Sequence, residues 1–169
     1  MLHLLGGEPF LYYDKIQHAI LYARKLEKET GKQLDISFCT SGIGFTQDRL
    51  DFIRDQRIYL AWSIDGTEEC HNKNRTFLGG KGAYQTVIGH KDMVVANIPD
   101  NYLGIAMTID ENTVENLYDS YMFLTGSLGF ACTINIAPVD GKIWVVDMQK
   151  KWITELVKIY DYIFEEIGK

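Results

Sequence analysis

Cysteine is scarce in this sequence: only three of the 169 residues are cysteines, they lie far apart, and none forms a Cys-x-x-Cys pair. A small secreted domain held together by disulfides would need an even and denser set, so that class of protein is excluded. An excess of basic charge is also lacking, because 17 lysines and arginines stand against 23 aspartates and glutamates. Nucleic-acid-binding domains usually present a basic face, so we expect no nucleic-acid partner.

Long apolar runs and targeting signals are missing as well. No run of 18 apolar residues occurs, which argues against a membrane-spanning helix. The opening "MLHLLGGEPF" has no basic start and reaches Glu8 too early for a signal peptide. We therefore expect a cytoplasmic protein with no membrane partner. Its length and its 46% of hydrophobic residues predict one domain over residues 1–169.

The pattern that is present alternates apolar runs with helix-like spacing. Gly31 is a candidate helix C-cap and Thr46 a candidate N-cap. Strands joined through helices in this way are parallel, with right-handed crossovers. An open doubly wound sheet and part of a β/α barrel both fit, although the G-x-G-x-x-G fingerprint of dinucleotide-binding sheets is absent. The expected strands are residues 2–5, 34–40, 58–64, 102–109 and 131–137, and one expected helix covers residues 84–96.

Glycines and polar residues follow the expected strands. Gly6, Gly7 and Glu8 come directly after the first strand. In parallel β/α proteins the chemistry gathers at the carboxyl ends of the strands. Glycines beside a carboxylate let a ligand approach the backbone while the acid binds an amine. The plain alternative is a strand-to-helix turn in which Glu8 and Pro9 begin a helix.

The next two strand ends carry Ser41, Ser63 and Asp65, and Arg75 lies shortly downstream. A serine beside a backbone turn can hold a carboxylate, and Arg75 could pair with one bidentately. An acid for an ammonium and a base for a carboxylate together predict an amino-acid-like ligand. Two plain alternatives stay open, because an aspartate before a glycine is a common turn pair and Arg75 lies in a charged stretch.

The histidines and cysteines do not predict a metal site. We expect Cys39 and Cys132 inside strands as small core residues. Cys70 is expected in a loop, and His71 as a hydrogen-bonding surface residue. None of them shows the spacing of a ligand set.

Three strings, in this order, resemble motifs of the radical S-adenosylmethionine superfamily, in the SPASM-type branch that matures peptides and sulfatases. "LLGGEP" resembles the GGE motif, and "CTSG" resembles a TNG motif with serine in place of asparagine. "WSIDGTEECHNKNR", followed by "GGKGAY", resembles the most specific stretch of that branch. The resemblance covers nearly the whole chain. It implies a partial (β/α) TIM-like barrel, with about five parallel strands in sequential order and helices outside.

The same resemblance implies a cofactor and a substrate. Enzymes of this branch generate a 5′-deoxyadenosyl radical from S-adenosyl-L-methionine, and this radical abstracts hydrogen from a peptide or protein. Glu8 with its glycines would hold the methionine amine, while Ser63 and Arg75 would hold the carboxylate. The expected cofactor-binding residues are Gly6, Gly7, Glu8, Ser41, Ser63, Asp65 and Arg75.

The sequence departs from that family in its cysteines. The family's CxxxCxxC loop, whose thiolates ligate a 4Fe–4S cluster, is not found in these 169 residues, and neither is the cysteine-rich extension. We therefore expect a fragment spanning the second to sixth β/α units, inactive alone, with the cluster present only in the full-length enzyme. The alternatives are a degenerate, non-catalytic β/α module that binds a peptide or an S-adenosylmethionine-like ligand, and an unrelated β/α protein. An edge strand at residues 2–5 also predicts self-association.

Overall fold

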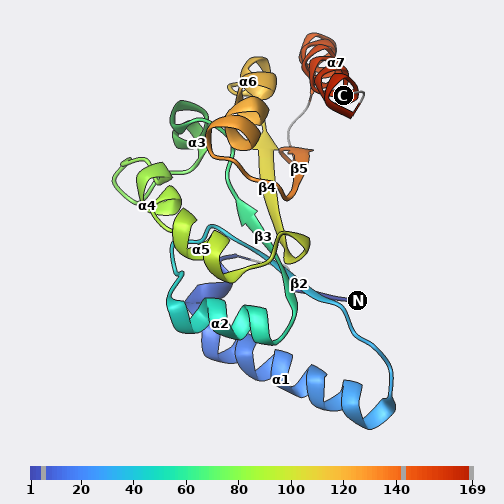
Figure 1. The fold of residues 1–169 in the computed structure, drawn as a ribbon. Helices are drawn as coiled ribbons and strands as arrows, with labels where there is room; N and C mark the ends of the chain where they lie inside the picture. Colours follow the sequence, from blue (N-terminus) through green and yellow to red (C-terminus); the bar gives the residue numbers. More distant parts are fainter. Residues whose placement is uncertain (5–6, 142–143, 168–169) are drawn as a thin grey trace. The chain divides into compact units, whose positions relative to one another are not determined.

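A five-stranded parallel sheet organises the computed structural model of the protein, which describes residues 1–4, 7–141 and 144–167 (Figure 1). The strands follow one another in sequence order and the sheet is not closed, so β1 and β5 are its edges. This confirms the partial β/α barrel expected from the sequence. The strands are β1 (Leu2–Leu4), β2 (Ile36–Thr40), β3 (Ile58–Ser63), β4 (Leu103–Ile109) and β5 (Thr133–Pro138).

The register aligns apolar side chains across neighbouring strands. Leu4 pairs with Phe38, Phe38 with Leu60, and Leu60 with Leu103. Phe38, Leu60 and Leu103 are almost completely buried. Because the side chains of a strand alternate between its two faces, this register puts one apolar layer on the helix-covered face and leaves small and polar residues on the other.

The chain divides into two compact units. The first comprises Met1–Ser63, Thr86–Ala106 and Cys132–Asn135, so it contains β1 to β3 and the first residues of β4 and β5. The second comprises Ile64–Gln85, Met107–Ala131 and Ile136–Lys169.

The first unit places helices against β1 to β3. In α1 (Tyr13–Thr30) the buried face includes Ile20 and Ala23, and the helix ends at Gly31, whose φ of +69° is the left-handed conformation expected of a C-cap. Thr46 caps α2 (Gln47–Asp55) by accepting a hydrogen bond from the Arg49 amide, as the sequence predicts. The other helical segments of this unit are η1 (Pro9–Tyr12), α5 (Lys91–Asn97) and η2 (Asp100–Tyr102).

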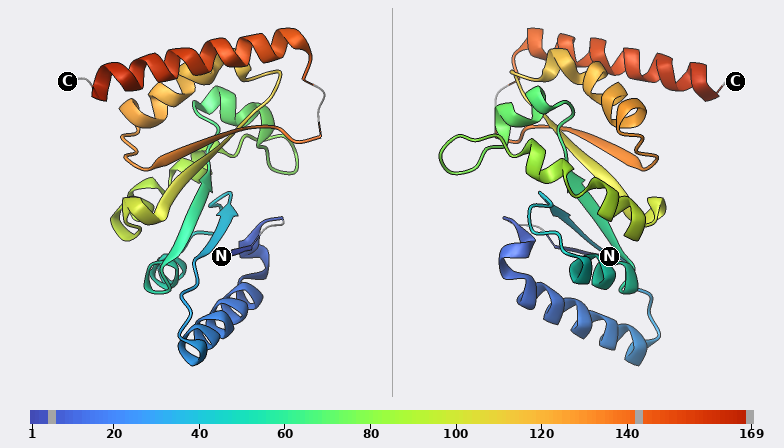
Figure 2. Two further views of the ribbon diagram at one scale, coloured as in Figure 1. Left: turned by 90° about the vertical axis from the view of Figure 1, so that its right-hand side faces the viewer. Right: turned by 60° about the vertical axis from the view of Figure 1, so that its left-hand side comes forward.

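The second unit is mainly helical. Its long helix α7 (Val146–Ile167) packs against α6 (Leu117–Met122) and the short turn η3 (Val114–Asn116), as both views of Figure 2 show. A buried carboxylate on α7, that of Glu155, accepts a hydrogen bond from the Tyr118 amide at the start of α6. The unit also contains α3 (Glu68–Asn74) and a π-helical turn, η4 (Phe123–Ser127).

Four local predictions were wrong. Cys132, expected inside a strand as a core residue, lies directly before β5, which begins at Thr133, and is only half-buried. The helix expected over residues 84–96 is two helices, α4 (Tyr84–Ile88) and α5, separated at Gly89 and His90. Cys70 lies in α3 and is buried, rather than in a loop. His71 is completely buried, rather than a surface residue. Cys70 and His71 differ from prediction because the charged stretch forms a helix, which Thr67 caps by accepting a hydrogen bond from the Cys70 amide, and both side chains lie on its buried side.

Within the part of the chain that the structure describes, none of the helices combines the length and apolar character needed to cross a bilayer.

Candidate functional site

Glu8 lies at the carboxyl end of the sheet in the first unit. Pro9 follows it at the first position of η1, and Glu8 Oε1 accepts a hydrogen bond from the Phe10 amide at 3.2 Å, so Glu8 is the N-cap of this turn. The same carboxylate reaches across to the end of β2. There, Oε1 accepts from the Thr40 hydroxyl at 2.5 Å, and Oε2 accepts from both the amide (2.8 Å) and the hydroxyl (2.5 Å) of Ser41. Glu8 and Ser41, both among the expected cofactor-binding residues, therefore contact each other.

The Glu8 carboxylate has the character of a cation site. Its donors are neutral, and none of the described residues forms a salt bridge with it, so its negative charge is oriented but not paired. An ammonium group would supply the missing positive charge by replacing the Ser41 hydroxyl, which can rotate away. Gly7 is exposed, and a Cβ at that position would meet nothing within 4 Å. Gly6 lies outside the described residues.

The end of β3 borders the same part of the first unit. Ser63 is buried, and its Oγ lies 3.3 Å from Cys39 Sγ on the neighbouring strand. Beside it, Trp62 Nε1 donates a hydrogen bond to the Ser41 carbonyl at 3.1 Å. Gly42 has a φ of +79°, and a Cβ there would lie 2.3 Å from this indole nitrogen, so the turn after β2 requires glycine. The turn thus fixes the backbone that presents Ser41 to Glu8.

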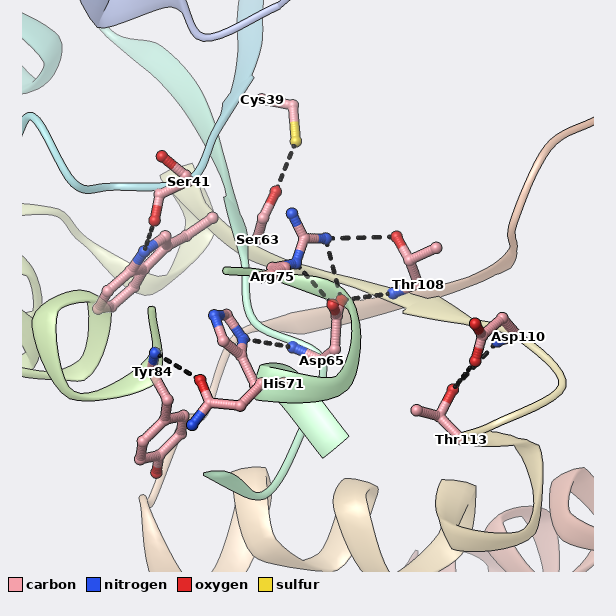
Figure 3. Close-up of polar contacts among 12 residues, drawn as sticks. Cys39, Ser41, Ser63, Asp65, His71, Arg75, Tyr84, Thr108, Asp110 and Thr113 are labelled. Atoms are coloured by element: carbon pink, nitrogen blue, oxygen red, sulfur yellow. Dashed lines mark hydrogen bonds and ion pairs between the residues drawn. The ribbon is translucent and has the colours of Figure 1, made fainter. Parts of the chain in front are cut away.

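The buried Asp65 forms an ion pair with the partly exposed Arg75 in the second unit (Figure 3). Arg75 Nε donates to Asp65 Oδ2 at 2.6 Å and Nη2 donates to Oδ1 at 3.0 Å, while the Thr108 amide also donates to Oδ1 at 2.9 Å. Asp65 is only 1% exposed. The bidentate edge of Arg75 is therefore occupied by Asp65. Nη1 is the nitrogen of the guanidinium that makes no hydrogen bond to the residues described here.

His71, which the sequence predicted to lie on the surface, is a further functional candidate. It is 0% exposed, and its Nδ1 accepts the Asp65 backbone N–H at 3.3 Å. Burial lowers the pKa of His71 to about 4, with smaller and opposing effects from Asp65, which raises it, and Arg75, which lowers it. The ring is therefore neutral at pH 7 and carries its proton on Nε2. Among the described residues, Nε2 is buried without a hydrogen-bond partner. The signal that could have identified His71 is its place in the string "HNKNR".

The loop that ends in "GGKGAY" folds back onto α3 and supports Arg75. Ala83 donates its amide hydrogen to the Arg75 carbonyl at 3.0 Å, and the Tyr84 amide donates to Asn72 Oδ1 at 3.0 Å. The Tyr84 ring meets His71 edge to face, with 5.8 Å between ring centroids. The two halves of the most specific motif therefore contact each other, and they hold the backbone from which Arg75 projects.

The three cysteines do not fit a 4Fe–4S cluster. Cys39 lies in β2, Cys70 is buried in α3, and Cys132 lies directly before β5. No group of three or more metal-ligating side chains gathers within residues 1–4, 7–141 and 144–167. Burial also raises the pKa of Cys132 to about 11, which opposes the thiolate form that iron requires.

An unclosed sheet of parallel strands in sequential order, with helices alongside, is the architecture of the radical S-adenosylmethionine partial barrels. Solved structures of anSMEcpe, an anaerobic sulfatase-maturating enzyme of that superfamily, share it. The structure with bound AdoMet and the Kp18Cys peptide matches with a TM-score of 0.82 and 16% sequence identity. The one with bound AdoMet and the Cp18Cys peptide matches with a TM-score of 0.81 and 17% identity.

These matches confirm the predicted resemblance at the level of the fold. Each covers 99% of this chain and 48% of the matched chain, so the chain spans about half the length of these solved structures. No protein-family model matches the sequence, and no curated protein is similar to it.

Proposed function

We propose that this chain is the S-adenosylmethionine-binding part of a radical enzyme that modifies a ribosomally made peptide or protein by hydrogen abstraction. In this proposal, residues 1–169 are the second to sixth β/α units of the barrel. The observation that carries it is the Glu8 carboxylate, which is held by donors from the end of β2 and lacks a cationic partner among the described residues. The fold match with structures that hold AdoMet and a peptide supports the same assignment.

Each predicted residue has a distinct role in the proposal. Glu8 binds the ammonium of the methionine moiety, and Ser41 orients Glu8 until the ligand arrives. As the resemblance implies, Ser63 and Arg75 remain predicted to hold the carboxylate, and Nη1 is the nitrogen that Arg75 would use. Asp65 acts through Arg75 by fixing the plane of its guanidinium. Gly6 and Gly7 remain predicted to let the ligand approach the backbone.

Binding of S-adenosylmethionine to the 169-residue chain tests the assignment, measured by isothermal titration calorimetry. Glu8→Gln keeps the size and an acceptor oxygen but removes the charge, so we expect affinity to fall about tenfold or more. Glu29→Gln, a change of an exposed carboxylate on α1, is the matched control and should leave affinity unchanged. Equal affinities of the wild-type chain and Glu8→Gln would contradict the proposal.

Decarboxylated S-adenosylmethionine tests the carboxylate contact separately. This ligand keeps the amine, so its affinity should still fall in Glu8→Gln. It lacks the carboxylate, so the wild-type chain and Arg75→Gln should bind it with equal affinity. If Arg75→Gln weakens the complete and the decarboxylated ligand equally, Arg75 has no direct contact with the carboxylate.

The resemblance also implies a 4Fe–4S cluster in the full-length enzyme, and the cysteines of this chain do not form its site. We therefore propose that the chain alone is inactive. Anaerobic reconstitution followed by iron and sulfide analysis should give far less than one cluster per chain. A stoichiometric cluster that supports reductive cleavage of S-adenosylmethionine would refute this.

The same dispersal of cysteines favours a second candidate, a degenerate binding module for a peptide or an S-adenosylmethionine-like ligand. The two candidates differ in what happens when the cluster-bearing part is present. Joined to a polypeptide that carries the CxxxCxxC loop, the first candidate should cleave S-adenosylmethionine after reduction. The second should bind it and release it intact.

A further inference from the structure

One face of α7 is apolar and exposed. The side chains concerned are between 49% and 71% exposed, although all are large and hydrophobic. Spacings of four, three and four residues put them on one face of a helix with 3.6 residues per turn. They are Ile153, Val157, Tyr160 and Phe164, which we call the α7 stripe.

The α7 stripe is not the face that holds the helix in its own unit. Ile159 and Glu155 are buried on the other side, where the Glu155 carboxylate contacts α6. Trp152 packs against Trp144, with 4.8 Å between their ring centroids. The opposite face of α7 therefore packs within its own unit, while the α7 stripe is exposed. An exposed apolar patch of this extent on a folded unit marks an interaction surface.

The spacing within the stripe is self-complementary. From Ile153 to Phe164 the steps are four, three and four residues, which read the same in both directions. A second copy of α7 running antiparallel would place Ile153 opposite the partner's Phe164 and Val157 opposite the partner's Tyr160. Such a contact has twofold symmetry, as the commonest dimers do.

The charged residues beside the stripe also favour an antiparallel arrangement of the two helices. Lys150 flanks its beginning, Glu165 flanks its end, and both lie on one side of it. In an antiparallel pair, flanks of the same side meet, so Lys150 of each copy would lie near Glu165 of the other. Lys150 is only loosely paired within its own helix, 3.9 Å from Asp147.

We propose that the α7 stripe is the interface of an antiparallel homodimer of this chain. Its side chains expose roughly 500 Å² per copy, so a pair would bury roughly 1,000 Å², which is the lower limit for a specific interface. We therefore expect a weak dimer that dissociates upon dilution. This surface is distinct from the β1 edge, through which the sequence predicted self-association.

Sedimentation equilibrium of the 169-residue chain, from about 1 to about 200 µM, tests the dimer. Ile153→Glu with Phe164→Glu places like charges opposite each other and should raise the dissociation constant more than about 100-fold. Ile153→Lys with Phe164→Glu creates two opposite-charge contacts in an antiparallel pair and should bind at least about tenfold more tightly than the double glutamate. Leu78→Glu, at a fully exposed site outside α7, is the control and should change nothing.

A charge swap tests the antiparallel orientation of the two helices without changing a residue of the stripe. Lys150→Glu and Glu165→Lys should each weaken the dimer, by roughly fivefold for two lost contacts, and the double variant should restore it. A monomeric wild-type chain over the whole range would overturn the proposal. A dimer that persists in the variant with Ile153→Glu and Phe164→Glu would also overturn it and would point to the β1 edge. So would a longer form of the polypeptide in which further residues cover the α7 stripe.

Discussion

Lowering the pH should destabilise the protein through His71. Burial lowers the pKa of His71 in the folded state to about 4, whereas the unfolded chain has an ordinary value of 6.5. Between pH 4 and pH 6.5, the His71 ring is protonated in the unfolded state and neutral in the folded state. The stability that the neutral buried ring contributes is therefore fully present above pH 6.5 and is lost as the pH falls towards 4. The smaller effects of Asp65 and Arg75 oppose each other, so the ring burial decides the sign.

The magnitude follows from the two pKa values. Between about pH 7.5 and about pH 4.5, the linkage relation gives a loss of about 2–3 kcal/mol from His71 alone. Carboxylates also titrate in this range, so a matched variant is needed. His71→Asn removes the titration but keeps an oxygen that can accept the Asp65 amide hydrogen, whereas His18→Gln changes an exposed histidine.

Urea unfolding at both pH values measures the effect. We expect the free energy of unfolding of the wild-type chain to fall about 2–3 kcal/mol more than that of His71→Asn, and that of His18→Gln to fall as much as that of the wild-type chain. The ring proton of His71, followed by NMR, should show a titration midpoint near 4. Parallel pH profiles for the wild-type chain and His71→Asn, or a midpoint at or above 6, would refute the reasoning.

Two further changes probe the second unit. Gly66 has a φ of +106°, and a Cβ there would lie 2.2 Å from the Cβ of Ser120, so Gly66→Ala should cost about 2–4 kcal/mol in urea unfolding. Gly126→Ala, where a Cβ meets nothing within 4 Å, should cost less than about 1 kcal/mol, and equal losses would show that crowding is not the cause. Asp65→Asn leaves Arg75 without its ion-pair partner and should lower the free energy of unfolding by about 2–3 kcal/mol. Adding Arg75→Gln should restore part of this loss, whereas a double variant that loses the sum of the two single losses would contradict a coupled pair.

The order of elements was predictable because its signals are local. Alternating apolar runs mark the strands, Thr46 caps a helix by bonding three residues ahead, and Gly31 adopts the left-handed conformation that ends another. Parallel strands joined by helices then leave few topologies, and the sequential sheet is one of them. The same rule accounts for the contact between Glu8 and Ser41, since both follow the ends of adjacent strands.

Burial and pairing were decided only by the tertiary structure. Arg75 was expected to be free for a ligand carboxylate, but Asp65, ten residues earlier, occupies its bidentate edge. His71 looked like a surface residue within a charged stretch, but α3 turns it inward against Asp65 and Tyr84. The sequence determines which residues are available and in which order they lie along the chain. Desolvation and charge pairing depend on which groups become neighbours in space, and only the folded chain sets those distances.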